Sequence, residues 1–254
     1  MLVAEVGGSR PAAPPPADTR PDLRAIERNY QASDDKVETW SPSLFGMIPL
    51  GGLGGSRELT ATEGKLLDNL TRDRGLLGLK AFSDIADQAF SVLADRVPPP
   101  TTMPASVERQ IAALPADQQD VARRAWPSND GHTDAFRHAY WNATLTAEFG
   151  ESWTAQFTTA HEGLPGNSAM REAMDLYNNE VGRQIATDNP DASRQELGDL
   201  VLRALDEGKL VVIDRSGHLA WSDDVARGDH GMTPSIAVPG AIGIPRGDAS
   251  ANGS

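Results

Sequence analysis

The stretch from Gly131 to Asn142 reads G-H-T-D-A-F-R-H-A-Y-W-N, and its apolar residues recur with the spacing of an α-helix. Four of them fall at positions i, i+3, i+4 and i+7, a pattern typical of a face that packs against a core: Phe136, Ala139, Tyr140 and Ala143. We expect one helix over 133–149, which Gly150 would end because glycine tolerates the backbone conformation of a helix C-terminus. The stretch therefore predicts a helix with one buried face.

Most of the chain around this stretch has the same helical periodicity. Helices are expected over 21–32, from a cap at Thr60 or Thr62 to about 72, and over 75–96, 106–114, 115–125, 152–161, 167–186 and 193–207. Ser152 and Asn167 are the expected N-caps of two of them. The residues from Leu210 to Trp221 predict a β-hairpin that turns at 215–217. The predicted fold class is all-α, a compact multi-helix domain with a small C-terminal β-hairpin.

The composition along the chain predicts four regions. Residues 1–20 are rich in Pro and Ala and residues 226–254 in Gly, Pro and Ser, so both are expected to be disordered. Residues 21–59 are expected to form a short helix and a Gly-rich apolar loop, and residues 60–225 the helical domain with the site. The apolar segment 44–54 is either a loop covered by the domain or a loop that touches lipid or gates a substrate.

The net charge of −13 and the pI of about 4.7 disfavour a broad nucleic-acid-binding surface, which needs a basic patch. The chain has no cysteine, which excludes disulfides and thiolate metal sites. No apolar run approaches the ~18 residues of a membrane span, so no transmembrane segment is expected. The first residues lack the pattern of a signal peptide. We therefore expect either secretion by a route that needs no signal peptide or a cytoplasmic location.

A polar stripe lies beside the apolar one on the helix over 133–149. Asp134 and His138 are four residues apart, so both side chains can reach one point. That spacing suits two ligands of one metal ion, or a carboxylate that orients a catalytic imidazole. The alternative is an ion pair on the helix surface.

Two further segments add polar groups at helical spacing. His161 and Glu162 end a helix just before a Pro-Gly turn, from which they can reach a neighbouring helix. Glu172, Asp175 and Asn179 share one stripe of the helix over 167–186. The pair Asn178-Asn179 is unfavourable within a helix, which a sequence tolerates best where the amides bind something.

These residues predict a site for a divalent metal ion, since carboxylates and imidazoles without thiolates suit Zn²⁺, Mn²⁺, Mg²⁺ or Ca²⁺. The expected metal ligands are Asp134, His138, His161 and Asp175. The expected catalytic residues are His138, Arg137 and a general base, Glu162 or Glu172. The expected substrate-binding residues are Trp141, Asn178 and Asn179. The alternative is a buried polar network that only fixes the packing of the helices.

Three motifs carry a resemblance to a bacterial domain family of uncharacterised function. They are D-A-x-R-H-x-x-W at 134–141, H-E-G at 161–163 and M-D-L-x-N-N-x-x-G-R at 174–183. The likeness is close over residues 129–187, and such domains resemble the C-terminal modules of secreted bacterial proteins and toxins. The resemblance implies a secreted effector, with a cognate inhibitor protein as a partner, and it implies no particular reaction.

The preferred hypothesis is a metal-dependent hydrolase of effector or toxin type. Its substrate is unknown, and the acidic surface favours a phosphodiester within a lipid headgroup, or a cell-wall substrate, over a long nucleic acid. The rival hypothesis is a non-enzymatic helical binding module that holds a partner through residues 44–54.

Overall fold

The computed structural model describes residues 20–44, 48–49, 56–164 and 167–233 and confirms a mostly helical fold with a C-terminal hairpin. The helices are α1 (Leu23–Asn29), α2 (Ala61–Arg96), α3 (Ala105–Ala112), α4 (Ala116–Ala125), α5 (His132–Phe149), α6 (Glu151–Glu162), α7 (Ala169–Asp188) and α8 (Arg194–Asp206), with the 3-10 turn η2 (Trp126–Ser128) before α5. The hairpin pairs β5 (Val211–Ile213) with β6 (Leu219–Trp221).

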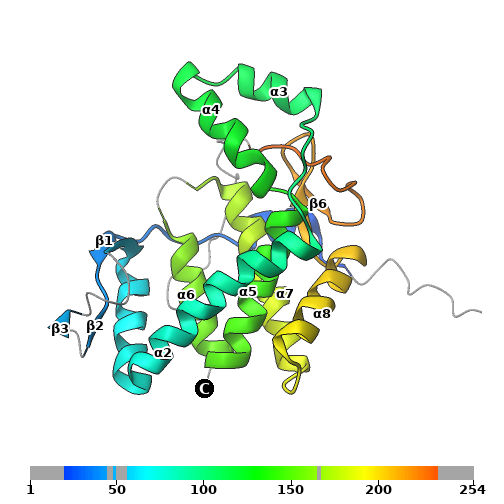
Figure 1. Ribbon diagram of the computed structural model, residues 1–254. Coiled ribbons are helices and arrows are strands. Elements are labelled where there is room, and N and C mark those ends of the chain that lie inside the picture. The colour runs from blue at the N-terminus through cyan, green and yellow to red at the C-terminus, as the bar shows by residue number, and fades with distance from the viewer. Residues whose placement is uncertain (1–19, 45–47, 50–55, 165–166, 234–254) are drawn as a thin grey trace, which may run out of the picture.

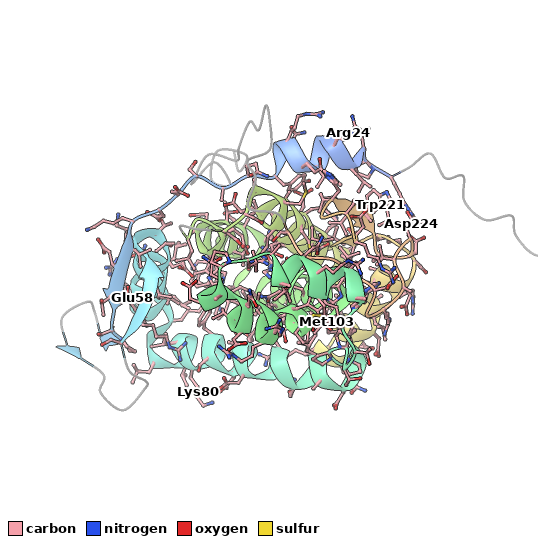
Figure 2. The ribbon with its side chains drawn as sticks, turned by 90° about the horizontal axis from the view of Figure 1, so that it is seen from above. Arg24, Glu58, Lys80, Met103, Trp221 and Asp224 are labelled. Carbon is pink, nitrogen blue, oxygen red and sulfur yellow. The ribbon has the colours of Figure 1, made fainter. Side chains whose placement is uncertain are left out.

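Helix α5 lies inside the bundle and packs against α2, α6, α7 and α8 (Figure 1). Seen from above, α1 and α2 run along opposite sides of it (Figure 2). The four residues of its predicted apolar stripe are all at most 1% exposed. They share one core with residues of α7, α8 and the hairpin. The stripe therefore packs α5 against the main core, as the periodicity predicted.

Helices α5 and α7 approach each other closely because α7 carries a glycine at the crossing. A Cβ atom added to Gly182 would lie 2.1 Å from the carbonyl oxygen of Ala139. Any larger residue would therefore push the two backbones apart. This contact sets the separation across which the polar side chains of α5 and α7 meet.

Helix α2 joins the two helices expected before residue 97 and kinks at Gly75, whose φ is 63°. Its start is the expected cap at Thr60: the Thr60 hydroxyl accepts from the N–H of Glu63, and the Glu63 carboxylate accepts from the N–H of Thr60. Its apolar face, with Leu67 and Phe82, packs on Leu145 of α5 and Phe157 of α6. This forms a second core cluster beside the first.

The hairpin turns where the sequence predicted. Asp214 accepts hydrogen bonds from the backbone N–H groups of Ser216 and His218, and Gly217 takes a φ of 85° that favours glycine. All three residues of β5 are buried against the main core. The buried strand explains why the segment reads Val-Val-Ile.

The structure differs from the prediction in residues 21–59, where strands lie in the expected loop. Strand β1 (Val37–Trp40) pairs antiparallel with β4 (Arg57–Thr60), and β2 (Ser43–Leu44) pairs with β3 (Ile48–Pro49). The sequences V-E-T-W and R-E-L-T are mostly exposed and lack the apolar alternation that marks a strand. Most of the segment 44–54 lies outside the described residues.

Two caps and one boundary also differ from the prediction. Helix α6 begins after Gly150 rather than Ser152, and α7 after Ser168 rather than Asn167. Residues 226–233, expected within the C-terminal tail, pack on the domain. The His230 ring stacks on Trp126 at 4.4 Å and is 2% exposed. The rest of that tail and residues 1–19 lie outside the described residues.

Among the helices that the structure describes, none is long and apolar enough to cross a membrane. This agrees with the absence of a long apolar run in the sequence.

Replacing Gly182 with alanine should destabilise the protein by about 3 kcal/mol or more, because the new methyl group overlaps the backbone of α5. The control is Gly198→Ala in α8, where the Cβ would meet only the end of the Arg96 side chain, at 3.1 Å. That side chain can move, and alanine favours a helix, so the control should stay within about 1 kcal/mol of wild type. Chemical denaturation measures both; equal stabilities would contradict the close crossing.

Candidate functional site

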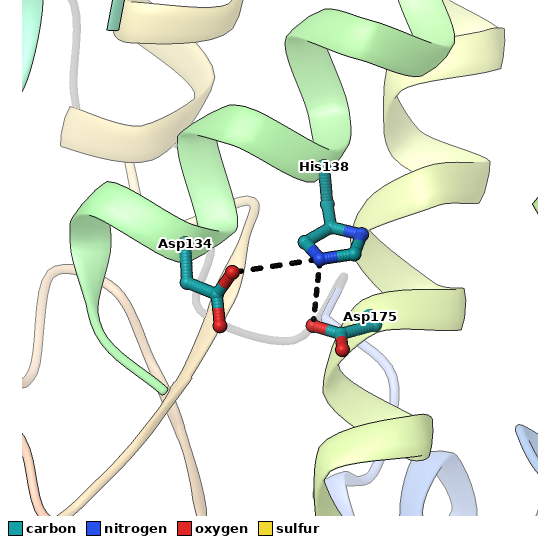
Figure 3. A group of neighbouring side chains, drawn as sticks. All are labelled: Asp134, His138 and Asp175. Carbon is teal, nitrogen blue, oxygen red and sulfur yellow. Dashed lines mark ion pairs between the residues drawn. The ribbon is translucent and has the colours of Figure 1, made fainter. Parts of the chain in front are cut away.

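Three buried side chains of α5 and α7 converge on one point (Figure 3). The Nε2 atom of His138 lies 3.4 Å from Oδ1 of Asp134 and 3.4 Å from Oδ1 of Asp175. Asp134 and His138 are one turn apart on α5, and Asp175 faces them from α7. The exposed fractions of the three residues are 1%, 6% and 3%. The structure therefore brings together three of the four residues expected to bind metal.

A chain of hydrogen bonds fixes the orientation of the His138 ring. The Arg183 guanidinium can only donate, and it donates to Oδ1 of Asn142 at 3.2 Å. The Nδ2 group of Asn142 then donates to the backbone carbonyl of His138 at 3.0 Å and to Oδ1 of Asn179 at 2.6 Å. Since Oδ1 of Asn179 is an acceptor, Nδ1 of His138 must donate to it, at 3.1 Å.

The consequence is that Nε2 of His138 faces Asp134 and Asp175, carrying either a proton or a free lone pair. Histidines that bind a metal generally donate their other ring N–H to a carbonyl or carboxylate, which fixes the tautomer. The carboxamide of Asn179 takes that part here. The arrangement suits a metal ligand as well as it suits an imidazolium held between carboxylates.

The charges around the ring favour a bound proton in the absence of a metal. Burial lowers the pKa of His138, but Asp175, Asp134 and Glu162 outweigh it and raise the pKa to about 9. Burial, together with Asp134 and Glu162, raises the pKa of Asp175 well above its usual range. The pair of His138 and Asp175 therefore holds a proton near neutral pH.

Asp134 is the ionised member of the group. Burial opposes its charge, but Arg137 and His138 hold the pKa of Asp134 well below its usual range. The backbone N–H of Asp130 also donates to its Oδ2 at 2.7 Å. One carboxylate is thus fixed as an anion, and its Oδ1 points toward the ring.

The two distances from Nε2 of His138 fit the spacing of ligands around one metal ion. Ligand atoms about 2.1 Å from a tetrahedral zinc ion lie about 3.4 Å apart, which matches both distances from Nε2 of His138. Oδ1 of Asp175 is buried and accepts no hydrogen bond from the described residues. Such an atom is a costly feature of a folded protein unless something binds it.

Arg137 competes for the same point. Its Nη2 atom lies 2.5 Å from Oδ1 of Asp134 and 3.2 Å from Nε2 of His138. The second contact is a hydrogen bond only while Nε2 is unprotonated. A metal ion at this point must therefore move the Arg137 guanidinium, which is 27% exposed and can turn toward the cavity.

Two of the three residues, His138 and Asp175, form part of the wall of a cavity of about 630 Å³, a size typical of small-molecule sites. Its lining contains residues of α2, α5, α6 and α7 and of the segment after α6: Ala86, Ala89, Arg137, His138, Trp141, His161, Glu162, Leu164, Asn167 and Asp175. The cavity gives a ligand access to the group.

Some of the other residues expected at the site lie in the cavity wall. Trp141, His161 and Glu162 all lie there. Oε1 of Glu162 accepts from Nδ2 of Asn179 at 3.3 Å and lies 3.6 Å from Nδ1 of His138. Glu162 therefore sits on the Nδ1 side of the ring, across from the two aspartates.

His161, the fourth residue expected to bind metal, lines the cavity but does not join the group of three. Its Nδ1 atom lies 2.9 Å from Oε1 of Glu63, whose carboxylate also accepts from the N–H of Thr60, the cap of α2. The end of α6 places the ring between Glu63 of α2 and Trp141 of α5, whose ring it meets edge to face at 5.6 Å. His161 thus forms another part of the wall.

Asn178 and Asn179 lie inside the protein and do not line the cavity. Asn178 donates to the carbonyl of Val211 and accepts from its N–H, both at 2.9 Å, so it anchors β5 to α7 rather than binding a substrate. Asn179 orients His138. Both amides do bind something, but their partners belong to the protein.

Glu172 also lies apart from the cavity wall, against the backbone of Ala32. Burial is the largest influence on it and raises the pKa of Glu172 to about 7, with Glu162 and Asp34 adding to the effect. Its side chain faces the segment after α1. Of the two residues expected as general base, Glu162 is therefore the one placed on the cavity wall.

Two residues that shape the site had no predicted role: Glu63, and Asn142, which lies on the same polar stripe as Asp134 and His138. Glu63 belongs to the motif Thr60-x-x-Glu63, which predicts a helix cap. The motif gives no indication of the second contact of Glu63, with His161. Asn142 follows His138 by four residues, and this spacing was the available signal of its link to the ring.

Replacing Glu172 with glutamine should stabilise the protein at high pH. The pKa of Glu172 is about 7 in the folded protein and near 4.5 when unfolded, so its stabilising contribution is lost as pH rises through 7. Glutamine keeps an acceptor for Ala32 without the charge. The variant should melt at a higher temperature than wild type at pH 8, and at nearly the same temperature at pH 4.5. If the melting temperatures of the variant and the wild type differ by the same amount at both pH values, the raised pKa of the buried Glu172 carboxyl is contradicted.

Comparison with known proteins assigns no activity to this arrangement. No curated protein and no solved structure matches the chain. Residues 100–209 match the family profile described as a domain of unknown function (DUF6973). The matched segment contains α5, α6 and α7, so Asp134, His138 and Asp175 all lie within a domain whose function is uncharacterised.

Proposed function

We propose that the chain is a metal-dependent hydrolase in which Asp134, His138 and Asp175 hold a divalent metal ion. The observation that carries the proposal is the convergence of a fixed His138 Nε2 atom and two aspartate oxygens, each 3.4 Å from it, beside a cavity. One of those oxygens lacks a hydrogen-bond partner among the described residues. A divalent ion is the class of ligand that uses all three atoms at once.

The surrounding residues have the charges that hydrolysis needs. A divalent ion, when bound, supplies Lewis acidity that polarises a carbonyl or phosphoryl oxygen and acidifies water. Glu162 lines the cavity with a buried carboxylate and can take a proton from water as general base. Arg137, released from Asp134, can stabilise the negative charge that develops on a substrate oxygen.

The biological setting is a further part of the proposal. The motifs at 134–141, 161–163 and 174–183 support an uncharacterised bacterial domain of effector or toxin type, acting after secretion. A toxin of this kind would have a cognate inhibitor protein. The cavity, rather than the acidic surface, would then be the part of the chain that meets a phosphodiester, lipid or cell-wall substrate.

The position of Arg137 favours a rival function. Its guanidinium already pairs with Asp134 beside the His138 ring, so the group can serve as a closed network that only locks α5 to α7. In that case the chain is a non-enzymatic helical binding module. The two functions predict different metal binding and different melting temperatures when Asp175 is replaced by asparagine.

Asp175→Asn should weaken binding of Zn²⁺ or Mn²⁺ by about 100-fold or more, since even partners that only support a ligand contribute 10–100-fold. The melting temperature without metal should stay level or rise, because burial beside Asp134 and Glu162 disfavours the Asp175 charge. Asp188→Asn, at the exposed end of the same helix, should change neither quantity. Calorimetric titration and thermal melts measure both.

Activity or growth inhibition should disappear with metal binding in Asp175→Asn, tested on a panel of ester, phosphodiester and cell-wall substrates. The rival function predicts instead a lower melting temperature in Asp175→Asn and no metal binding in the wild type. That pair of results would overturn the hydrolase.

Metal binding should strengthen with pH up to about 9, by about tenfold per pH unit for each proton released, because the metal must displace the proton shared by His138 and Asp175. Titrations in buffers of different ionisation enthalpy would count the released protons. Binding that is independent of pH between 6 and 8 would place the metal elsewhere.

A further inference from the structure

A second cavity, of about 390 Å³, adjoins the first and has mainly apolar walls. It lies between the β1–β4 pair, α2, α5 and α6. Large apolar side chains form most of its surface: Trp40, Leu59, Leu67, Leu79, Phe82, Trp141 and Phe157. Two of these rings, Phe82 and Phe157, pack edge to face at 5.0 Å and belong to the second core cluster.

The charged residues around this cavity already have partners within the protein, with one exception. Lys80 pairs with Asp84 at 2.6 Å, and Glu63 pairs with His161 at 2.9 Å. The indole N–H of Trp40 donates to Asp68 at 3.0 Å. Only Arg57, which is exposed on β4, forms no ion pair with another described residue. The cavity therefore offers apolar contact rather than polar recognition.

Three residues line both cavities: Ala86, Trp141 and His161. Asp175 and His138 lie in the wall of the first cavity only, and most of the large apolar side chains line the second cavity only. A ligand that enters both must therefore be polar at one end and apolar at the other. It must also pass the three side chains that line both cavities, and a single alkyl chain does so more readily than a wide ring system.

We infer that the second cavity holds the acyl chain of a lipid substrate, whose polar group lies at the group of Asp134, His138 and Asp175. This inference rests on the proposed hydrolase and narrows its substrate to an acyl amphiphile. Cell-wall glycans and nucleic acids lack an apolar chain and leave the second cavity empty.

The test is binding of saturated fatty acids of increasing chain length to the full chain, measured by displacement of a fluorescent fatty acid. No hydrolysis is needed for this measurement. Each added methylene should tighten binding by about fourfold until the cavity is filled. Binding that does not change with chain length would overturn the inference.

A matched pair of variants locates the binding. Ser83 lines the second cavity and not the first, so Ser83→Phe should fill it and weaken fatty-acid binding by about tenfold or more. Ser91→Phe places the same side chain on an exposed part of α2 and should bind as wild type does. Equal binding by both variants would overturn the inference, and thermal melts confirm that both are folded.

Metal titration separates this inference from the proposed function. Ser83→Phe should bind metal as tightly as the wild type, because it does not touch the group of three. Chain-length-dependent binding that Ser83→Phe removes, in a protein that binds no metal, would support the acyl cavity and reject the hydrolase. Tight metal binding without fatty-acid binding would support the hydrolase and reject the acyl cavity.

Discussion

The close crossing of α5 and α7 is the constraint on which the rest of the structure depends. Gly182 rests against the backbone of Ala139 with no room for a Cβ atom. At that separation, the Asn179 amide of α7 can bond both Asn142 and the His138 ring of α5, at 2.6 and 3.1 Å. A wider crossing would break these bonds and remove Asp175 from the ring. One backbone contact thus fixes both the core and the geometry of the candidate site.

The hydrogen-bond chain through this crossing gives the site a direction. Arg183 can only donate, so Oδ1 of Asn142 accepts from it and Nδ2 of Asn142 donates to Oδ1 of Asn179. Because Oδ1 of Asn179 is an acceptor, Nδ1 of His138 must donate to it. The opposite nitrogen is thereby turned to Asp134 and Asp175 and to the cavity. The buried charges then make this nitrogen strongly basic, so a proton occupies it where a metal does not. Fixed polarity of this kind is preorganisation, which a site needs and a loose cluster of polar residues lacks.

Much of this arrangement could be predicted from the sequence, because helical periodicity carries it. The stripe of Phe136, Ala139 and Tyr140 predicted the buried face of α5, and the spacing of Asp134 and His138 predicted their meeting. Contacts between elements were less predictable. His161 was expected at the metal but turns to Glu63, and Asn178 was expected at a substrate but anchors β5. The partners, Glu63 and Val211, lie far from these residues in the sequence, so local spacing does not predict either contact. Strands β1 and β4 were missed because their exposed residues do not alternate.

The central claim is that Nε2 of His138 and the two aspartates are built to hold a divalent cation. Crystals grown with Mn²⁺ or Zn²⁺ and measured at the metal's absorption edge test it most directly. The account predicts an anomalous peak about 2.0–2.2 Å from Nε2 of His138 and from one oxygen each of Asp134 and Asp175, with Arg137 moved into the cavity. An absence of any peak there, with Arg137 still paired with Asp134 at saturating metal, would contradict the claim and leave the group as a lock between two helices.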